Sequence, residues 1–89
     1  MRVKNDYIFR QVADEYLLIP VGAAALTTKG LIGLSESAYL LYEKLKTSCS
    51  RQDLIQAILA EYDVDTITAE ADVDAFLAHM RKLDMLEED

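Results

Sequence analysis

The stretch Gly30-Leu31-Ile32-Gly33-Leu34-Ser35-Glu36 joins a short apolar strand directly to the start of a helix. Its central glycine, Gly33, marks a place where another backbone can come close to the strand. Ser35 or Ser37 can cap the helix that follows. Helical spacing then places apolar side chains on one face of that helix, at Ala38, Leu41, Tyr42 and Leu45. The stretch therefore predicts a junction between a sheet that precedes it and helices that follow it.

The segment before this junction predicts an antiparallel hairpin. Residues 7–12 mix aromatic and β-branched side chains, Ala13-Asp14 suits a tight turn, and residues 15–19 form the returning strand. Pro20 cannot donate to a ladder, so it should end that strand or lie on an edge. Residues 20–30 have the composition of a loop, and the pattern leaves open whether the alanine run 23–25 makes a helical turn.

Two more helices are predicted after the junction. The first begins with Ser50-Arg51-Gln52-Asp53, a carboxylate form of the capping box, and the second is expected to be capped by Thr66 or Thr68. Basic residues near the end of the last helix, Arg81 and Lys82, complement its macrodipole. The apolar faces of these two helices are formed by Leu54, Ile55, Ile58, Leu59, Val73, Phe76, Leu77, Met80 and Leu83.

The predicted fold is therefore α+β, of winged helix-turn-helix type, with a three-stranded antiparallel sheet followed by three helices in the order βββααα. Residues 1–89 form one domain, since a chain of this length has room for a single core. If residues 31–34 lie at a sheet edge, they present apolar side chains and a row of unpaired backbone N–H and C=O groups, with no Lys or Pro among them to protect the edge. Such an edge is a docking site for an added strand, unless loop 20–30 or self-association covers it.

The charge distribution argues against nucleic acid as a partner. The net charge is −7, and residues 51–89 hold three Lys/Arg against eleven Asp/Glu, a balance of −8. Binding to phosphate backbones requires basic surface. A winged-helix DNA-binding transcriptional regulator is the alternative function, and it would need a basic recognition face. No apolar run approaches the roughly 20 residues that span a bilayer, so we expect no membrane partner.

Motifs for catalysis and for metal or cofactor binding do not occur in the sequence. The three glycines form neither GxGxxG nor a P-loop, and one Cys with one His matches no standard zinc spacing. We therefore expect no catalytic residues, no metal, no cofactor and no enzymatic activity. A single cysteine and an N-terminus without a secretory pattern favour a cytoplasmic protein.

Four segments in this order and spacing resemble the PqqD-like family, whose domain is also called the RiPP recognition element. They are Gly30 to Glu36, Leu59 to Asp65, Ala71 to Leu77 and Arg81 to Leu86, and the resemblance runs from about Tyr7 to Leu86. The chain departs from the family pattern at Ser35, where Asn is frequent, and at Asp84-Met85-Leu86, where Gly-Leu-Leu is frequent.

The resemblance implies that the leader segment of a ribosomally made precursor peptide adds as a strand to the third strand, beside the third helix. The chain would present that leader to a modifying enzyme such as a radical SAM protein or a leader peptidase. A homodimer formed through the same strand edge is a further expectation. Periodicity does not decide which helix residues face the cleft. The expected peptide-binding residues are Leu31, Ile32, Gly33, Leu34, Asp72, Val73, Phe76, His79, Met80 and Leu83.

Overall fold

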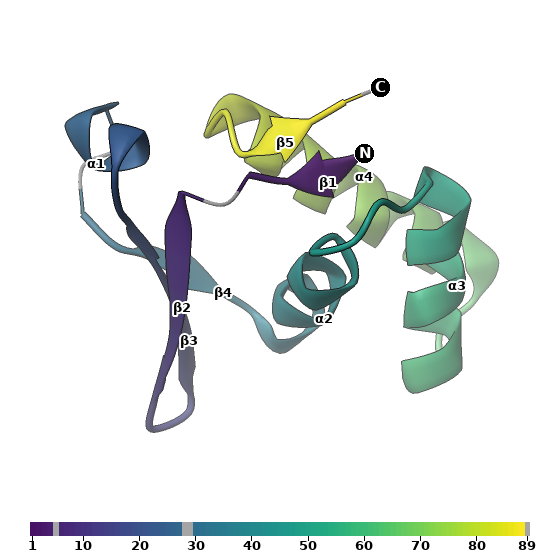
Figure 1. The fold of residues 1–89 in the computed structure, drawn as a ribbon. Coiled ribbons are helices and arrows are strands. Elements are labelled where there is room, and N and C mark those ends of the chain that lie inside the picture. The colour runs from purple at the N-terminus through teal and green to yellow at the C-terminus, as the bar shows by residue number, and fades with distance from the viewer. Residues whose placement is uncertain (5, 28–29, 89) are drawn as a thin grey trace.

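The structure, a computed structural model, describes residues 1–4, 6–27 and 30–88. Within these residues a hairpin and a third strand stand beside a group of helices, and a second, smaller sheet joins the two ends of the chain (Figure 1). The elements in chain order are β1 (Arg2–Val3), β2 (Tyr7–Val12), β3 (Glu15–Pro20), α1 (Ala23–Thr27), β4 (Ile32–Leu34), α2 (Glu36–Lys44), α3 (Arg51–Glu61), α4 (Thr66–Lys82) and β5 (Leu86–Glu87).

The main sheet is antiparallel, with the strand order β2-β3-β4. Its hairpin turns at Ala13-Asp14, where Ala13 has a φ of 55°, and Val12 pairs with Glu15 on either side of the turn. Pro20 is the last residue of β3. The α+β class and the three-stranded antiparallel sheet are thus confirmed, as are the turn position and the end of the second strand.

The predicted loop 20–30 contains a short helix, α1, which includes the alanine run 23–25. The sequence left a helical turn open at this place, and the structure shows one. Residues 28 and 29 of the predicted loop lie outside the described residues.

Side-chain caps fix the starts of the three longer helices. Ser35 accepts a hydrogen bond from the Ala38 N–H at 3.2 Å, and Ser50 with Asp53 forms the predicted reciprocal capping box at the start of α3. The predicted cap of the last helix is wrong. Asp65 caps α4 by accepting from the Thr68 N–H at 2.7 Å, because the helix begins at Thr66 and Asp65 is the residue just before its first turn. That backbone hydrogen bond lowers the pKa of the Asp65 carboxyl from its ordinary value.

A second sheet, missing from the prediction, pairs β1 with β5 near the two chain ends (Figure 1). The Val3 N–H donates to the Leu45 carbonyl at 2.9 Å, and the Lys4 N–H donates to the Met85 carbonyl at 2.9 Å. The N-terminal segment is thereby tied to the C-cap of α2 and to the residue just before β5. Strands of two residues are too short to show an alternating pattern, so periodicity cannot reveal them.

The core lies between the main sheet and helices α2, α3 and α4. Tyr42 and Phe76, predicted as core residues from their helical spacing, are both buried. Tyr39 is half-buried and stacks on Phe9 from the hairpin, with ring centroids 4.6 Å apart. The largest fully buried side chains are Leu18, Leu41, Leu45, Leu54, Ile55, Ile58, Met80, Met85 and Val73.

Across the described ranges, no helix has both the length and the apolar character needed to cross a bilayer.

The end of α4 has a left-handed backbone conformation at Asp84, and this gives a first prediction. Asp84 has a φ of 56°, its N–H donates to the Arg81 carbonyl, and the Met85 N–H donates to the Met80 carbonyl, which together form a Schellman motif. Glycine adopts this left-handed conformation without strain. We expect Asp84→Gly to raise the free energy of unfolding by about 0.5 to 1 kcal/mol.

The measurement is urea unfolding at high salt, which screens the exposed ion pair between Lys4 and Asp84. The control is Asp84→Asn, which removes the same charge but keeps a side chain that tolerates positive φ. A glycine variant that is less stable than the asparagine variant would contradict the prediction.

Candidate functional site

Strand β4 forms one edge of the main sheet. It pairs with β3 on one side, in the register Tyr16↔Leu34, Leu17↔Gly33 and Leu18↔Ile32. On its other side no strand of residues 1–4, 6–27 or 30–88 pairs with it. Of the two positions that the sequence left open for this strand, edge and centre, the structure therefore shows the edge.

The register shows which backbone groups of β4 point away from the sheet. The Val21 N–H donates to the Asp6 carbonyl, so the odd-numbered residues of β3 direct their hydrogen-bonding groups toward β2. The even-numbered residues, including Tyr16 and Leu18, therefore face β4. Their partners on β4 use their own N–H and C=O groups toward β3, because such pairs alternate along an antiparallel ladder. Gly33, between them, directs its N–H and C=O to the open edge.

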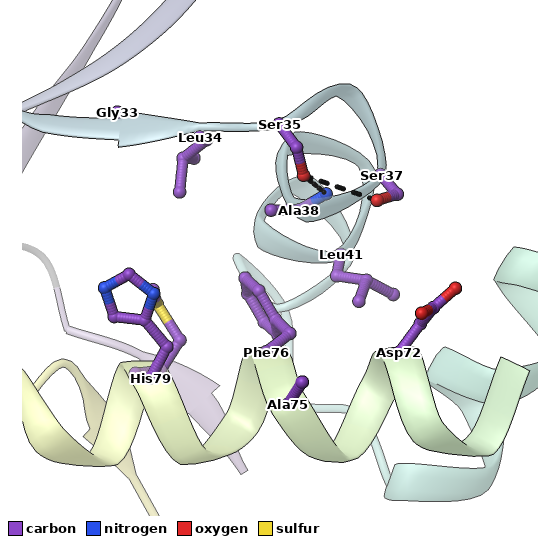
Figure 2. A pocket seen from close by; sticks show the side chains of 11 residues that line it. Gly33, Leu34, Ser35, Ser37, Ala38, Leu41, Asp72, Ala75, Phe76 and His79 are labelled. Carbon is purple, nitrogen blue, oxygen red and sulfur yellow. Dashed lines mark hydrogen bonds between the residues drawn. The ribbon is translucent and has the colours of Figure 1, made fainter. Parts of the chain in front are cut away.

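A cleft of about 300 Å³ lies beside this edge, between the end of β4, the first turns of α2 and one face of α4 (Figure 2). Its apolar floor is formed by buried side chains from all three elements, Leu34, Leu41, Phe76 and Met80. Exposed Asp72 and His79 lie on the α4 side, and Ser35 and Ser37 lie at the start of α2. Figure 2 shows the Phe76 ring and the His79 ring directed from α4 toward Leu34 and the start of α2.

Six of the ten residues expected from the sequence line this cleft: Gly33, Leu34, Asp72, Phe76, His79 and Met80. The other four lie elsewhere. Ile32 and Val73 are buried in the core, with 8% and 0% of their surface exposed, and Leu83 is the C-cap of α4. Leu31 is 58% exposed and precedes β4.

The sequence prediction missed one wall of the cleft. The missed lining residues are Ser35, Ser37, Ala38 and Leu41, which form the α2 wall, and also Ala75 on α4. Ser35, Ala38 and Leu41 were assigned to capping and core packing, and these assignments hold in part, since Ser35 is the cap and Leu41 is buried. Spacing along one helix cannot show that α2 crosses close to α4 beside β4. The only available signal was that α2 follows the edge strand without a loop.

The arrangement is suited to binding an extended chain. An added strand would meet the outward N–H and C=O of Gly33, and its alternate side chains would point into the cleft. The titratable side chains that line the cleft are Asp72 and His79. They are seven residues apart on α4, about 10 Å along the helix axis, which is too far for the two groups to act on one proton.

Two solved structures resemble this fold over nearly its whole length. One is described as TbiB1 in complex with the TbiA(beta) leader peptide; it has a TM-score of 0.78 and 26% sequence identity and covers 100% of this chain and 98% of that one. The other is a lasso peptide synthetase B1 complexed with the leader peptide, with a TM-score of 0.76, 21% identity, and coverage of 98% and 96%. No curated protein matches the sequence.

Residues 15–86 match the family model described as Coenzyme PQQ synthesis protein D (PqqD). This range runs from the start of β3 to the first residue of β5 and includes every residue that lines the cleft. The chain therefore belongs to the PqqD family and is a PqqD-like RiPP recognition element.

Proposed function

We propose that this protein binds the leader segment of a ribosomally synthesised precursor peptide as an added strand on β4. The observation that carries the proposal is the position of Gly33, whose outward backbone groups stand at an open sheet edge and beside an apolar cleft. Main-chain hydrogen bonds supply general affinity in strand addition, and pockets for alternate side chains supply specificity.

The comparisons support this proposal. Both similar structures were solved with a leader peptide, and the one at 26% identity covers this entire chain. The other edge of the main sheet, β2, is also an edge strand, but the cleft lies beside β4. We therefore place the leader on β4 and not on β2.

The protein acts in this proposal as an adaptor without catalysis of its own. It presents the leader to a separate modifying enzyme, such as a radical SAM protein or a leader peptidase. A homodimer that pairs two copies of β4 would occupy the same backbone groups of Gly33. Self-association through this edge would therefore compete with leader binding.

The test is a titration of the ¹⁵N-labelled chain with the leader of its cognate precursor, followed by amide NMR shifts. We expect the largest shifts at residues 30–34 and at the residues of α4 that line the cleft, Asp72, Ala75, Phe76, His79 and Met80. The amides of β2 serve as an internal control, because that strand forms the opposite edge of the same sheet. Shifts concentrated on β2 or α3, with none on β4, would refute the proposal.

A further inference from the structure

A second hollow lies on another side of α2, and nothing in the proposed leader site uses it. We call it the tyrosine–glutamate hollow. It has a volume of about 210 Å³ and is lined by Tyr16, Glu36, Tyr39, Leu40, Glu43, Glu61 and Tyr62. None of these residues lines the leader cleft, although Glu36, Tyr39 and Leu40 alternate along α2 with the cleft residues Ser37, Ala38 and Leu41.

The aromatic side of the hollow is held rigidly. The rings of Tyr16 and Tyr39 are nearly parallel, at 4° and with centroids 4.5 Å apart, and Phe9 stacks on Tyr39 from the hairpin. Tyr62, the C-cap of α3, supplies the third phenol. All three tyrosines are only half-buried and line the hollow, so a partner can reach the parts of their rings that the stack leaves uncovered. The hollow thus offers preformed aromatic surface contributed by a strand and two helices.

The carboxylates of the hollow are poorly balanced by cations. Glu43 pairs with Lys46 at 2.8 Å, but Glu36 and Glu61 form no ion pair within the described part of the chain. Glu61 is the last residue of α3, where the helix dipole disfavours a negative charge, and the last turn of α3 contains no basic residue. Burial raises the pKa of the Tyr62 hydroxyl, and the negative charges of Glu36 and Glu61 raise it further. The effect of these two charges agrees with a position of both carboxylates near the Tyr62 ring.

We propose that the tyrosine–glutamate hollow receives an arginine side chain from a basic segment of the modifying enzyme. A guanidinium stacks on aromatic faces and pairs with carboxylates through a planar fork, so it matches both parts of the lining. The net charge of −7 favours a basic partner over an acidic one. The identification of this partner as a modifying enzyme rests on the proposed leader-binding function.

The position of the hollow fits delivery of a bound leader. The cleft and the hollow are both lined by α2, whose diameter with side chains is about 10 to 12 Å. An enzyme that contacts the hollow would therefore lie about one helix width from the bound leader.

The probe is the tripeptide acetyl-Gly-Arg-Gly-amide, titrated into the ¹⁵N-labelled full chain at constant ionic strength, with acetyl-Gly-Gln-Gly-amide as the neutral control. We expect the arginine peptide to shift the amides of Tyr16, Tyr39 and Tyr62, with a dissociation constant of about 1 to 10 mM. Equal shifts with both peptides, or no shift at these residues at 20 mM arginine peptide, would overturn the proposal.

Variants of Glu36 and Glu61 test whether the carboxylates of the hollow bind the arginine peptide. Glu36→Gln combined with Glu61→Gln should weaken the arginine peptide at least threefold, while Glu70→Gln, outside the hollow, should leave its affinity unchanged. An unchanged affinity in the double variant would also overturn the proposal. Leader binding is measured separately on the same variants. Absence of leader binding to the unaltered chain would refute the leader proposal, whereas absence of arginine-peptide binding to the unaltered chain, with leader binding intact, would refute only this inference.

Discussion

Gly33→Pro is expected to weaken leader-peptide binding by tenfold to a hundredfold while leaving the fold intact. Proline removes the N–H that Gly33 directs to the open edge, and its ring obstructs the approach of another strand. Loss of one main-chain hydrogen bond together with this obstruction corresponds to about 1.5 to 3 kcal/mol of binding free energy. The fold should tolerate the change, because Gly33 makes no bond to β3 and a Cβ added there would meet nothing within 4 Å.

The measurement is leader affinity by fluorescence anisotropy, together with the thermal unfolding midpoint. Gly33→Ala is the matched control, since it adds a Cβ but keeps the N–H. Ile32→Pro would be a different experiment, because the N–H of Ile32 faces β3 and its removal would damage the sheet itself. If the proline variant binds the leader as tightly as the alanine variant, strand addition at this edge is wrong.

Met80→Ala is expected to lower the free energy of unfolding by about 2 to 5 kcal/mol. The Met80 side chain is fully buried, and it contributes both to the core and to the floor of the cleft. Its truncation leaves a cavity among side chains of the sheet and helices that cannot all collapse into it. For a small domain this loss is a large fraction of the total stability. Urea unfolding followed by circular dichroism measures it.

His79→Ala is the companion variant on the same turn of α4. His79 is exposed on the rim of the cleft, so its truncation should change the free energy of unfolding by less than about 0.5 kcal/mol. It should nevertheless reduce leader affinity if the rim contacts the leader. A large loss of stability in His79→Ala, or none in Met80→Ala, would show that the division between core and rim is wrong.

Much of the fold could be predicted from the sequence because several of its elements are stabilised by interactions between residues that are close together in the chain. The capping box at Ser50 and Asp53 depends on residues three apart, and the hairpin turn depends on two residues between two strand patterns. Buried faces such as that of Leu54, Ile55 and Ile58 follow from helical spacing alone. Six of the residues predicted to bind peptide also line the cleft, since the family resemblance points to the strand and helix beside it, and their role in binding stays a prediction.

The features that were missed depend on contacts between distant parts of the chain. β1 and β5 gain their pairing only when the two chain ends meet, and neither has a pattern of its own. The α2 wall of the cleft depends on how that helix crosses α4. The wrong cap of α4 has a different cause. Asp65, Thr66 and Thr68 are all acceptable capping residues, and the exact start of the helix, which local patterns do not fix, selects among them.

The pairing of β1 with β5 has a consequence for protein engineering. Arg2 lies opposite Glu87, so the first and last segments of the chain are separated by only about 5 Å, one strand spacing. A protein fused to either terminus would leave the molecule from nearly the same point, and fusions in the two orders should be geometrically interchangeable. A short linker could also join the ends, with new termini opened at the exposed Ala13-Asp14 turn, to give a circular permutant with the β4 edge unchanged.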